Sequence, residues 1–321
     1  MVSHSVVLEH AVLTRVGYID VAIDPTAAGL DAEDFAAITW REPLWTEGEQ
    51  LRAGAAIWFA DVGSTRLAFD PVQAADAVLR SDAATEQAQQ HSIADLLSES
   101  GFDRMSVDLL VMTHIEGVGM SAWREVDGSW TRFFPNANVA VSVAALEAFL
   151  ARERKGDDDV EFDAWHALID QGVVVTYDDG EAIVAGVTAR ITGAHCPGHS
   201  VLHFGVDAGA PEATMLGHLA ISPVHLATGE CPRQHPEPAL AWSMLRGAAD
   251  DGRLLIGPLW PAPGSGRWVN NSFVATTPPN PPFHAPQRRK RACFARGKSG
   301  WGTVGSYEDD DSERRACHDR R

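Results

Sequence analysis

The chain has 321 residues, 45% of them hydrophobic and 22% charged, which fits one large globular domain or two ordinary ones and contains no apolar run long enough to span a membrane. Residues 285–321 hold ten Lys and Arg and six Asp and Glu, net +4, so that 16 basic and 38 acidic residues, net −22, remain in residues 1–284. Such an acidic body repels polyanions, so nucleic acid is excluded as its partner, and because no secretory signal opens the chain we expect a cytoplasmic protein.

In the first half of the chain, short apolar runs alternate with longer amphipathic stretches, a pattern that is typical of a mixed α/β domain. Residues 55–70 predict two strands around a Gly-Ser turn, ending at Asp70, and residues 71–100 predict a helical region that stops at Gly101. Residues 106–114 form a short β-rich run that ends in polar side chains. A buried strand delivers side chains to a site at its tip, so the end of this run is the first place to look for chemistry.

The second half continues the same alternation. We predict a strand over 138–143, a helix over 144–154, a hairpin over 173–192 that turns at 178–180, and strands over 201–206, 213–217 and, last, 253–257. From Thr276 the chain is rich in Pro, Gly and unpatterned charge and cannot bury enough apolar surface to offset its conformational entropy. We therefore expect a main domain over residues 1–284 and a loosely ordered tail over residues 285–321.

Histidine placement is the most informative feature. Of 13 histidines, four lie at the ends or flanks of predicted strands: His114, His195, His199 and His218. The spacing His114-x-Glu116 puts two potential ligands on the same side of an extended segment, because side chains alternate with period two. Histidine and carboxylate side chains at strand ends are what a metal site on an α/β scaffold requires.

These motifs resemble the metallo-β-lactamase superfamily, in particular its lactonase-like hydrolases, over roughly residues 10–275. In that family a strand ends in T-H-x-H-x-D-H, a loop reads H-T-x-G-H, a later strand ends in G-D, and a final His stands near F-P-x-P-G-x-G-R. The corresponding segments here are THIEGVG (113–119), HCPGH (195–199), LGH (216–218) and LWPAPGSGR (259–267). The resemblance implies a four-layer αββα sandwich.

Departures from the family pattern fall on the metal ligands. The resemblance implies one metal site formed by His114, Glu116, His199 and His218, with Asp70 and His195 as supporting residues that hold the ligands. Val118, Gly119 and Leu259 stand where the family has the remaining ligands of its second site, and their side chains cannot bind a metal. We therefore expect at most one Zn²⁺, Fe²⁺ or Mn²⁺ ion, or an empty, remodelled pocket.

Two functions remain open at this point. The first is a non-catalytic or accessory subunit that pairs with a homologous metallo-β-lactamase-fold subunit in a hetero-oligomeric hydrolase acting on a small ester, lactone or aryl ether. The second is a divergent mononuclear metallohydrolase that acts on such a small molecule itself through a metal-bound hydroxide. An oligomer is expected, because several of the ten tryptophans could line an interface.

The four cysteines have no CxxC pair and are expected to be free thiols, with Cys196 either a buried thiol or, beside His195, a nucleophile.

Overall fold

The computed structural model describes residues 4–41, 43–70, 92–116, 121–156, 159–207, 209–229 and 235–276. The chain divides into two units, residues 1–280 and 281–321, and the second unit lies entirely outside the described residues. The predicted tail over 285–321 falls there too, so this assignment stays a prediction. None of the helices in the described ranges is long and apolar enough to cross a membrane.

The first sheet begins with long antiparallel strands and ends with short parallel ones. Its order is β1-β2-β4-β5-β6-β9-β10, with β3 paired to the edge of β4, and the pairs β5/β6, β6/β9 and β9/β10 are parallel. Of the parallel strands, β6 and β9 are largely buried, which explains their apolar sequences, whereas the edge strand β10 is partly exposed. The strands are β1 (His4–Val7), β2 (Ala11–Ile23), β3 (Thr46–Glu47), β4 (Gln50–Val62), β5 (Thr65–Phe69), β6 (Leu109–Val111), β9 (Asn138–Ser142) and β10 (Val174–Tyr177).

The second sheet is antiparallel except for one pair. Its order is β11-β12-β13-β14-β15-β16-β17, and only β14/β15 within it is parallel. A separate ribbon pairs β7 (Ala122–Arg124) with β8 (Trp130–Arg132). The strands of the second sheet are β11 (Ala182–Val184), β12 (Val187–Ile191), β13 (Ser200–Phe204), β14 (Ala213–Met215), β15 (Leu254–Ile256), β16 (Ser265–Val269) and β17 (Ser272–Ala275).

Short helices connect and cover these sheets. Three of the α-helices begin at side-chain caps, Asp31 before α1, Ser142 before α4 and Asp159 before α5, each of which accepts a backbone N–H of the first turn. The α-helices are α1 (Ala32–Ala37), a helix over residues 92–99, α4 (Val143–Ala151), α5 (Val160–Asp170), α6 (His225–Thr228) and α7 (Pro238–Asp250). The 3-10 turns are η1 (Pro25–Ala28), η2 (Thr39–Arg41), η3 (Arg104–Ser106) and η4 (Gly217–Leu219).

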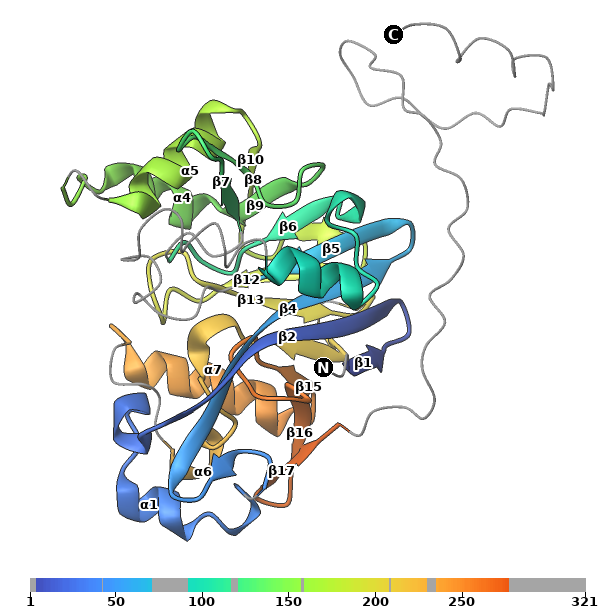
Figure 1. The fold of residues 1–321 in the computed structure, drawn as a ribbon. Coiled ribbons are helices and arrows are strands. Elements are labelled where there is room, and N and C mark those ends of the chain that lie inside the picture. The colour runs from blue at the N-terminus through green and yellow to red at the C-terminus, as the bar shows by residue number, and fades with distance from the viewer. Residues whose placement is uncertain are drawn as a thin grey trace, which may run out of the picture. The chain divides into compact units, whose positions relative to one another are not determined.

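Three apolar cores define the layers, which can be followed in Figure 1. The middle core joins side chains of both sheets, such as Trp58 and Phe69 of the first and Phe204 and Met215 of the second. A second core lies between the first sheet and helices α4 and α5, and a third joins the second sheet to α6, α7 and the segment around α1. Two sheets packed face to face with helices outside form the αββα sandwich that the sequence predicts.

The structure corrects the predicted hairpin over residues 173–192. Strand β10 pairs parallel with β9 in the first sheet, whereas β11 and β12 form a hairpin in the second sheet. The predicted turn at residues 178–180 is therefore the place where the chain crosses between sheets. The prediction of 253–257 as the last strand is also wrong, because β16 and β17 follow it. Alternation of apolar residues does not reveal which neighbour a strand pairs with.

Candidate metal centre

His114 and Glu116 follow the end of β6, next to the end of β5. Asp70, the residue after β5, is fully buried, and its carboxylate accepts the Thr113 backbone N–H on one oxygen and the Thr113 hydroxyl on the other, both at 2.6 Å. The same Thr113 Oγ1 lies 2.9 Å from His114 Nδ1. This chain of contacts fixes the imidazole of His114 so that its Nε2 faces away from the strand.

The loop that carries His195 and His199 is held against the start of α4. Gly198 has a φ of +74°, and a Cβ at this position would lie 2.1 Å from the backbone nitrogen of Ala145. Only glycine fits such a close approach. The Ser142 hydroxyl caps α4 and donates to the Gly198 carbonyl at 2.6 Å, which ties the loop to the first sheet.

His199 uses both of its ring nitrogens in contacts with the protein. It is fully buried; its Nε2 accepts the His218 backbone N–H at 3.3 Å, and its Nδ1 lies 2.8 Å from Thr192 Oγ1. Burial, reinforced by the neighbouring imidazoles, holds the pKa of His199 well below its usual value. A neutral His199 that donates from Nδ1 and accepts at Nε2 satisfies this environment.

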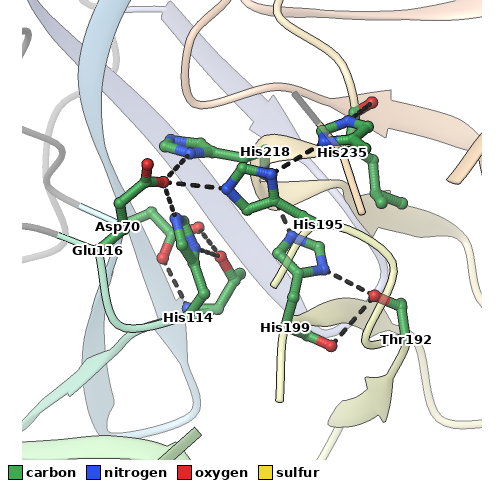
Figure 2. Close-up of polar contacts among 10 residues, drawn as sticks. Asp70, His114, Glu116, Thr192, His195, His199, His218 and His235 are labelled. Carbon is green, nitrogen blue, oxygen red and sulfur yellow. Dashed lines mark hydrogen bonds and ion pairs between the residues drawn. The ribbon is translucent and has the colours of Figure 1, made fainter. Parts of the chain in front are cut away.

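Three imidazoles converge on one carboxylate oxygen, as Figure 2 shows. Glu116 Oε2 lies 3.1 Å from His114 Nε2, 3.0 Å from His195 Nε2 and 3.1 Å from His218 Nδ1. The ligand atoms of these four residues all lie within 4.8 Å of one another. His218 reaches the cluster from η4, the turn that follows β14 in the second sheet, so each sheet contributes members of the cluster.

The hydrogen bonds of His235 determine the tautomer of a neutral His195. His235 Nε2 lies 3.2 Å from the Leu219 carbonyl oxygen, which only accepts, so this nitrogen carries a proton. Burial lowers the pKa of His235, and in the neutral ring Nδ1 is then an acceptor. His195 Nδ1, 3.0 Å away, therefore donates to it, and in the neutral form of His195 the lone pair of Nε2 is directed at Glu116.

His114 presents its lone pair in the same direction. Burial lowers its pKa to about 3, so the ring is neutral. When Asp70 is ionised, the Thr113 hydroxyl donates to it and accepts from His114 Nδ1–H, which leaves a lone pair on Nε2. Two imidazole lone pairs then lie about 3 Å from a carboxylate oxygen, and these acceptor atoms repel one another. A cation placed between them would remove this repulsion.

This donor set fits a divalent transition-metal ion. Three imidazoles and one carboxylate are ligands that Zn²⁺, Fe²⁺ and Mn²⁺ accept in proteins. Asp70 through Thr113, and His235 directly, orient two of the imidazoles, as groups that hydrogen-bond to metal ligands commonly do.

The structure brings together three of the four ligands that the sequence predicts, His114, Glu116 and His218. The fourth member of the group is His195, which the sequence predicts as a supporting residue, and His199 lies outside the group. Asp70 hydrogen-bonds to Thr113, which in turn contacts His114, and its supporting role at a metal site stays a prediction. Sequence reasoning missed His235, because it stands in a Pro-rich segment with no neighbouring motif or periodic pattern.

The remaining sequence predictions concern Val118, Gly119, Leu259 and the cysteines. Val118 and Gly119 lie outside the described residues, and Leu259 is half-buried in the loop after β15. Cys196 is a free thiol whose pKa is raised to about 12 by burial and by the charges of Glu116 and Asp70, which does not favour its alternative role as a nucleophile. The other three cysteines lie outside the described residues.

No model of a known protein family matches the sequence, and no curated protein matches it. Among solved structures the chain is similar to the hydrolase AbOPH of the β-lactamase superfamily, with a TM-score of 0.66 and 16% identity over 86% of this chain and 97% of that chain. It is also similar to AidC, a dizinc quorum-quenching lactonase in complex with its product N-hexanoyl-L-homoserine, with a TM-score of 0.65 and 13% identity over 87% and 98% of the two chains. A probable metal-dependent hydrolase from Staphylococcus aureus has a TM-score of 0.59 and 14% identity over 84% and 99%.

These likenesses show that the chain has the metallo-β-lactamase fold. The αββα sandwich implied by the sequence resemblance is confirmed, and it covers nearly the whole of each of these structures. On that fold the chain carries a group of four residues suited to a metal ion.

Proposed function

We propose that this protein is a hydrolase that holds one divalent metal ion with His114, Glu116, His195 and His218. The observation that carries the proposal is the convergence of three imidazole nitrogens on Glu116 Oε2, two of them with lone pairs directed there by their other hydrogen bonds. When bound, the ion supplies Lewis acidity, which activates an ester or lactone carbonyl for attack by water.

The chain's own residues have separate tasks in this proposal. Asp70 and Thr113 keep the proton of His114 on Nδ1, and His235 keeps that of His195 on Nδ1, so that both Nε2 atoms remain free to bind. Glu116 provides the negative charge that offsets the ion. Its side chain is 59% exposed, so it forms the solvent side of the centre, where a substrate must arrive.

For the substrate we propose a small uncharged ester or lactone. The named relatives support this class by analogy, since one of them is a lactonase in complex with an acyl-homoserine product. The net charge of −22 on residues 1–284 disfavours polyanionic substrates.

Metal analysis of the purified chain tests the proposal. We expect one ion per chain in the wild type, loss of that ion in His195→Ala, and its retention in His166→Ala, a half-buried histidine on α5 that is no member of the cluster. Hydrolysis of a lactone panel should be lost with the metal and restored when it is added back. A metal-free, inactive wild type, or two ions held by this cluster, would contradict the proposal.

The identity of the fourth ligand needs its own comparison. His199→Ala should disturb stability, because the ring is buried and doubly hydrogen-bonded, yet leave the ion in place in the folded fraction. If His199→Ala releases the ion and His195→Ala retains it, the ligand set predicted from the sequence is the right one.

A second candidate function is the accessory subunit of a hetero-oligomeric hydrolase. Leu259 favours it, because an apolar side chain stands where the sequence resemblance implies a ligand of a second metal site. Trp45, Trp58 and Trp260, for example, are buried within the chain's own core, which leaves fewer tryptophans for an interface. Light scattering on the chain alone and co-expressed with an intact homologue tests this candidate, which a fully active monomer would exclude.

A further inference from the structure

A cavity of about 240 Å³ lies on the outer face of the second sheet, where helix α7 covers it. Its lining includes polar side chains of four neighbouring strands or strand ends and two residues of α7: Arg190, His203, Thr214, Arg253, Met244 and Gly247. None of these residues belongs to the candidate metal centre.

Strand register explains why the polar side chains meet. His203 of β13 lies directly opposite Thr214 of β14, and Arg190 of β12 lies opposite Val201, two residues before His203. Residues in opposed or i, i+2 positions share one face of a sheet. Arg190, His203 and Thr214 therefore point to the same side, toward α7.

Two polar atoms of this lining are buried without a partner. Thr214 is 1% exposed, and neither its Oγ1 nor His203 Nδ1 makes a hydrogen bond within the described residues. A buried hydroxyl in such a position costs free energy unless another molecule bonds to it. An apolar valine would fill the same place in the strand without that cost.

Two guanidinium groups border these atoms, and each stands beside one carboxylate. Arg253 pairs with Asp251 at 2.5 Å, and Arg190, whose side chain is 52% exposed, lies 3.6 Å from Asp179. Both arginines belong to the lining and keep N–H groups that can donate to a bound molecule. The same two guanidiniums add to burial in lowering the pKa of His203.

Helix α7 leaves room for an occupant. Gly247 is an exposed residue of α7 that lines the cavity, and an added Cβ there would meet no atom within 4 Å, so the helix does not crowd this edge of the cavity. A volume of about 240 Å³ accommodates a small molecule, below the usual size of a drug-binding pocket.

We propose that this cavity binds a small oxyanion, a carboxylate or a phosphate, through Arg190, Arg253, Thr214 and His203. Guanidinium groups donate to such anions in a fork geometry, and the hydroxyl and imidazole supply the remaining hydrogen bonds. The site is separate from the proposed hydrolytic centre and does not depend on it.

Isothermal titration of metal-free full-length protein tests the site. Inorganic phosphate and acetate are titrated separately at constant ionic strength, with chloride as the background anion. We expect saturable binding of one ion per chain by at least one of the two, and the responding ion distinguishes the phosphate from the carboxylate class. The absence of saturation by both up to about 50 mM, or equal competition by chloride, would overturn the proposal.

Matched variants locate the binding. Thr214→Val and Arg190→Gln should each weaken it about tenfold or more, since each removes a hydrogen bond to a charged group. Gly247→Leu, which fills the cavity, should abolish it, whereas Arg246→Gln on the same helix, outside the lining, and His195→Ala should leave it unchanged.

Thr214→Val has a second readout. Without the anion its melting temperature should equal or exceed that of the wild type, and the rise on adding the anion should disappear. Wild-type affinity in Thr214→Val, Arg190→Gln and Gly247→Leu together would refute the site.

Discussion

Removing the Thr113 hydroxyl tests how the candidate centre is held together. Thr113→Val keeps the shape of this fully buried side chain but deletes an oxygen that contacts Asp70 at 2.6 Å and His114 at 2.9 Å. Losing a hydrogen bond to a charged group costs roughly 1.5–3 kcal/mol, and leaving a buried ring nitrogen without a partner costs about 1–3 kcal/mol. Asp70 keeps the backbone bond from residue 113. We therefore expect the free energy of unfolding to fall by about 3 kcal/mol.

Urea unfolding of metal-free protein, followed by circular dichroism, measures this change. The matched control is Thr131→Val on β8. The Thr131 hydroxyl donates to the Glu125 carboxylate at 3.1 Å in a half-buried setting, so its removal should lower the free energy of unfolding by no more than about 1 kcal/mol. Metal affinity of Thr113→Val should also fall by about 10- to 100-fold, because the support of a ligand is lost. A stability within about 0.5 kcal/mol of the wild type would refute this account of the contacts.

Three further predictions concern other parts of the chain. Gly198→Ala should lower the free energy of unfolding, measured by thermal melting, by about 3 kcal/mol or more, because the added Cβ would clash with Ala145. In the control Gly193→Ala, at a φ of +60° with no atom within 4 Å, this free energy should fall by only about 1 kcal/mol. Equal decreases in the two variants would contradict this prediction. The pKa of His203 is lowered to about 4 in the folded chain, so between pH 4 and 6.5 the unfolded chain binds more protons at this residue than the folded chain does. The free energy of unfolding should therefore rise from pH 4 to 6.5. If His203→Gln shows the same dependence of this free energy on pH as the wild type, the contribution assigned to His203 is wrong. Gly247→Ala should raise the free energy of unfolding, measured in urea, by about 1 kcal/mol, because alanine favours a helix over glycine and the added methyl group meets no atom within 4 Å. A decrease in this free energy would contradict the prediction.

Much of the fold could be predicted from local patterns. The hairpin that ends at Asp70, the strand over 138–143 and the helix after it all appear near the expected residues, because each has a clear apolar period and a turn or cap at its boundary. The long strand β2 was harder to foresee: residues 11–23 mix polar and apolar residues, and only pairing with β4 explains them. Pairing partners depend on the tertiary structure, so the crossing at residues 178–180 has no local signal.

The candidate site was predictable only in part. His114, Glu116 and His218 stand in recognisable motifs beside strand ends, which places them together. The choice between His195 and His199 depends on the contact of each Nε2: that of His199 accepts the His218 backbone N–H, whereas that of His195 faces Glu116. No sequence motif reveals this difference. The ten tryptophans suggested an interface, yet six are buried, since a sandwich with three apolar cores has more interior to fill than a single core.

The position of the cluster at the junction of the two sheets has a consequence for folding. His114 and Glu116 belong to the first half of the chain, whereas His195 and His218 come from the second, 79 and 102 residues beyond Glu116. The ligand set therefore does not exist until the halves have docked, a step with a high loop-closure cost. An ion held by all four residues would therefore link the two halves of the chain, and its binding free energy would add to the stability of their association.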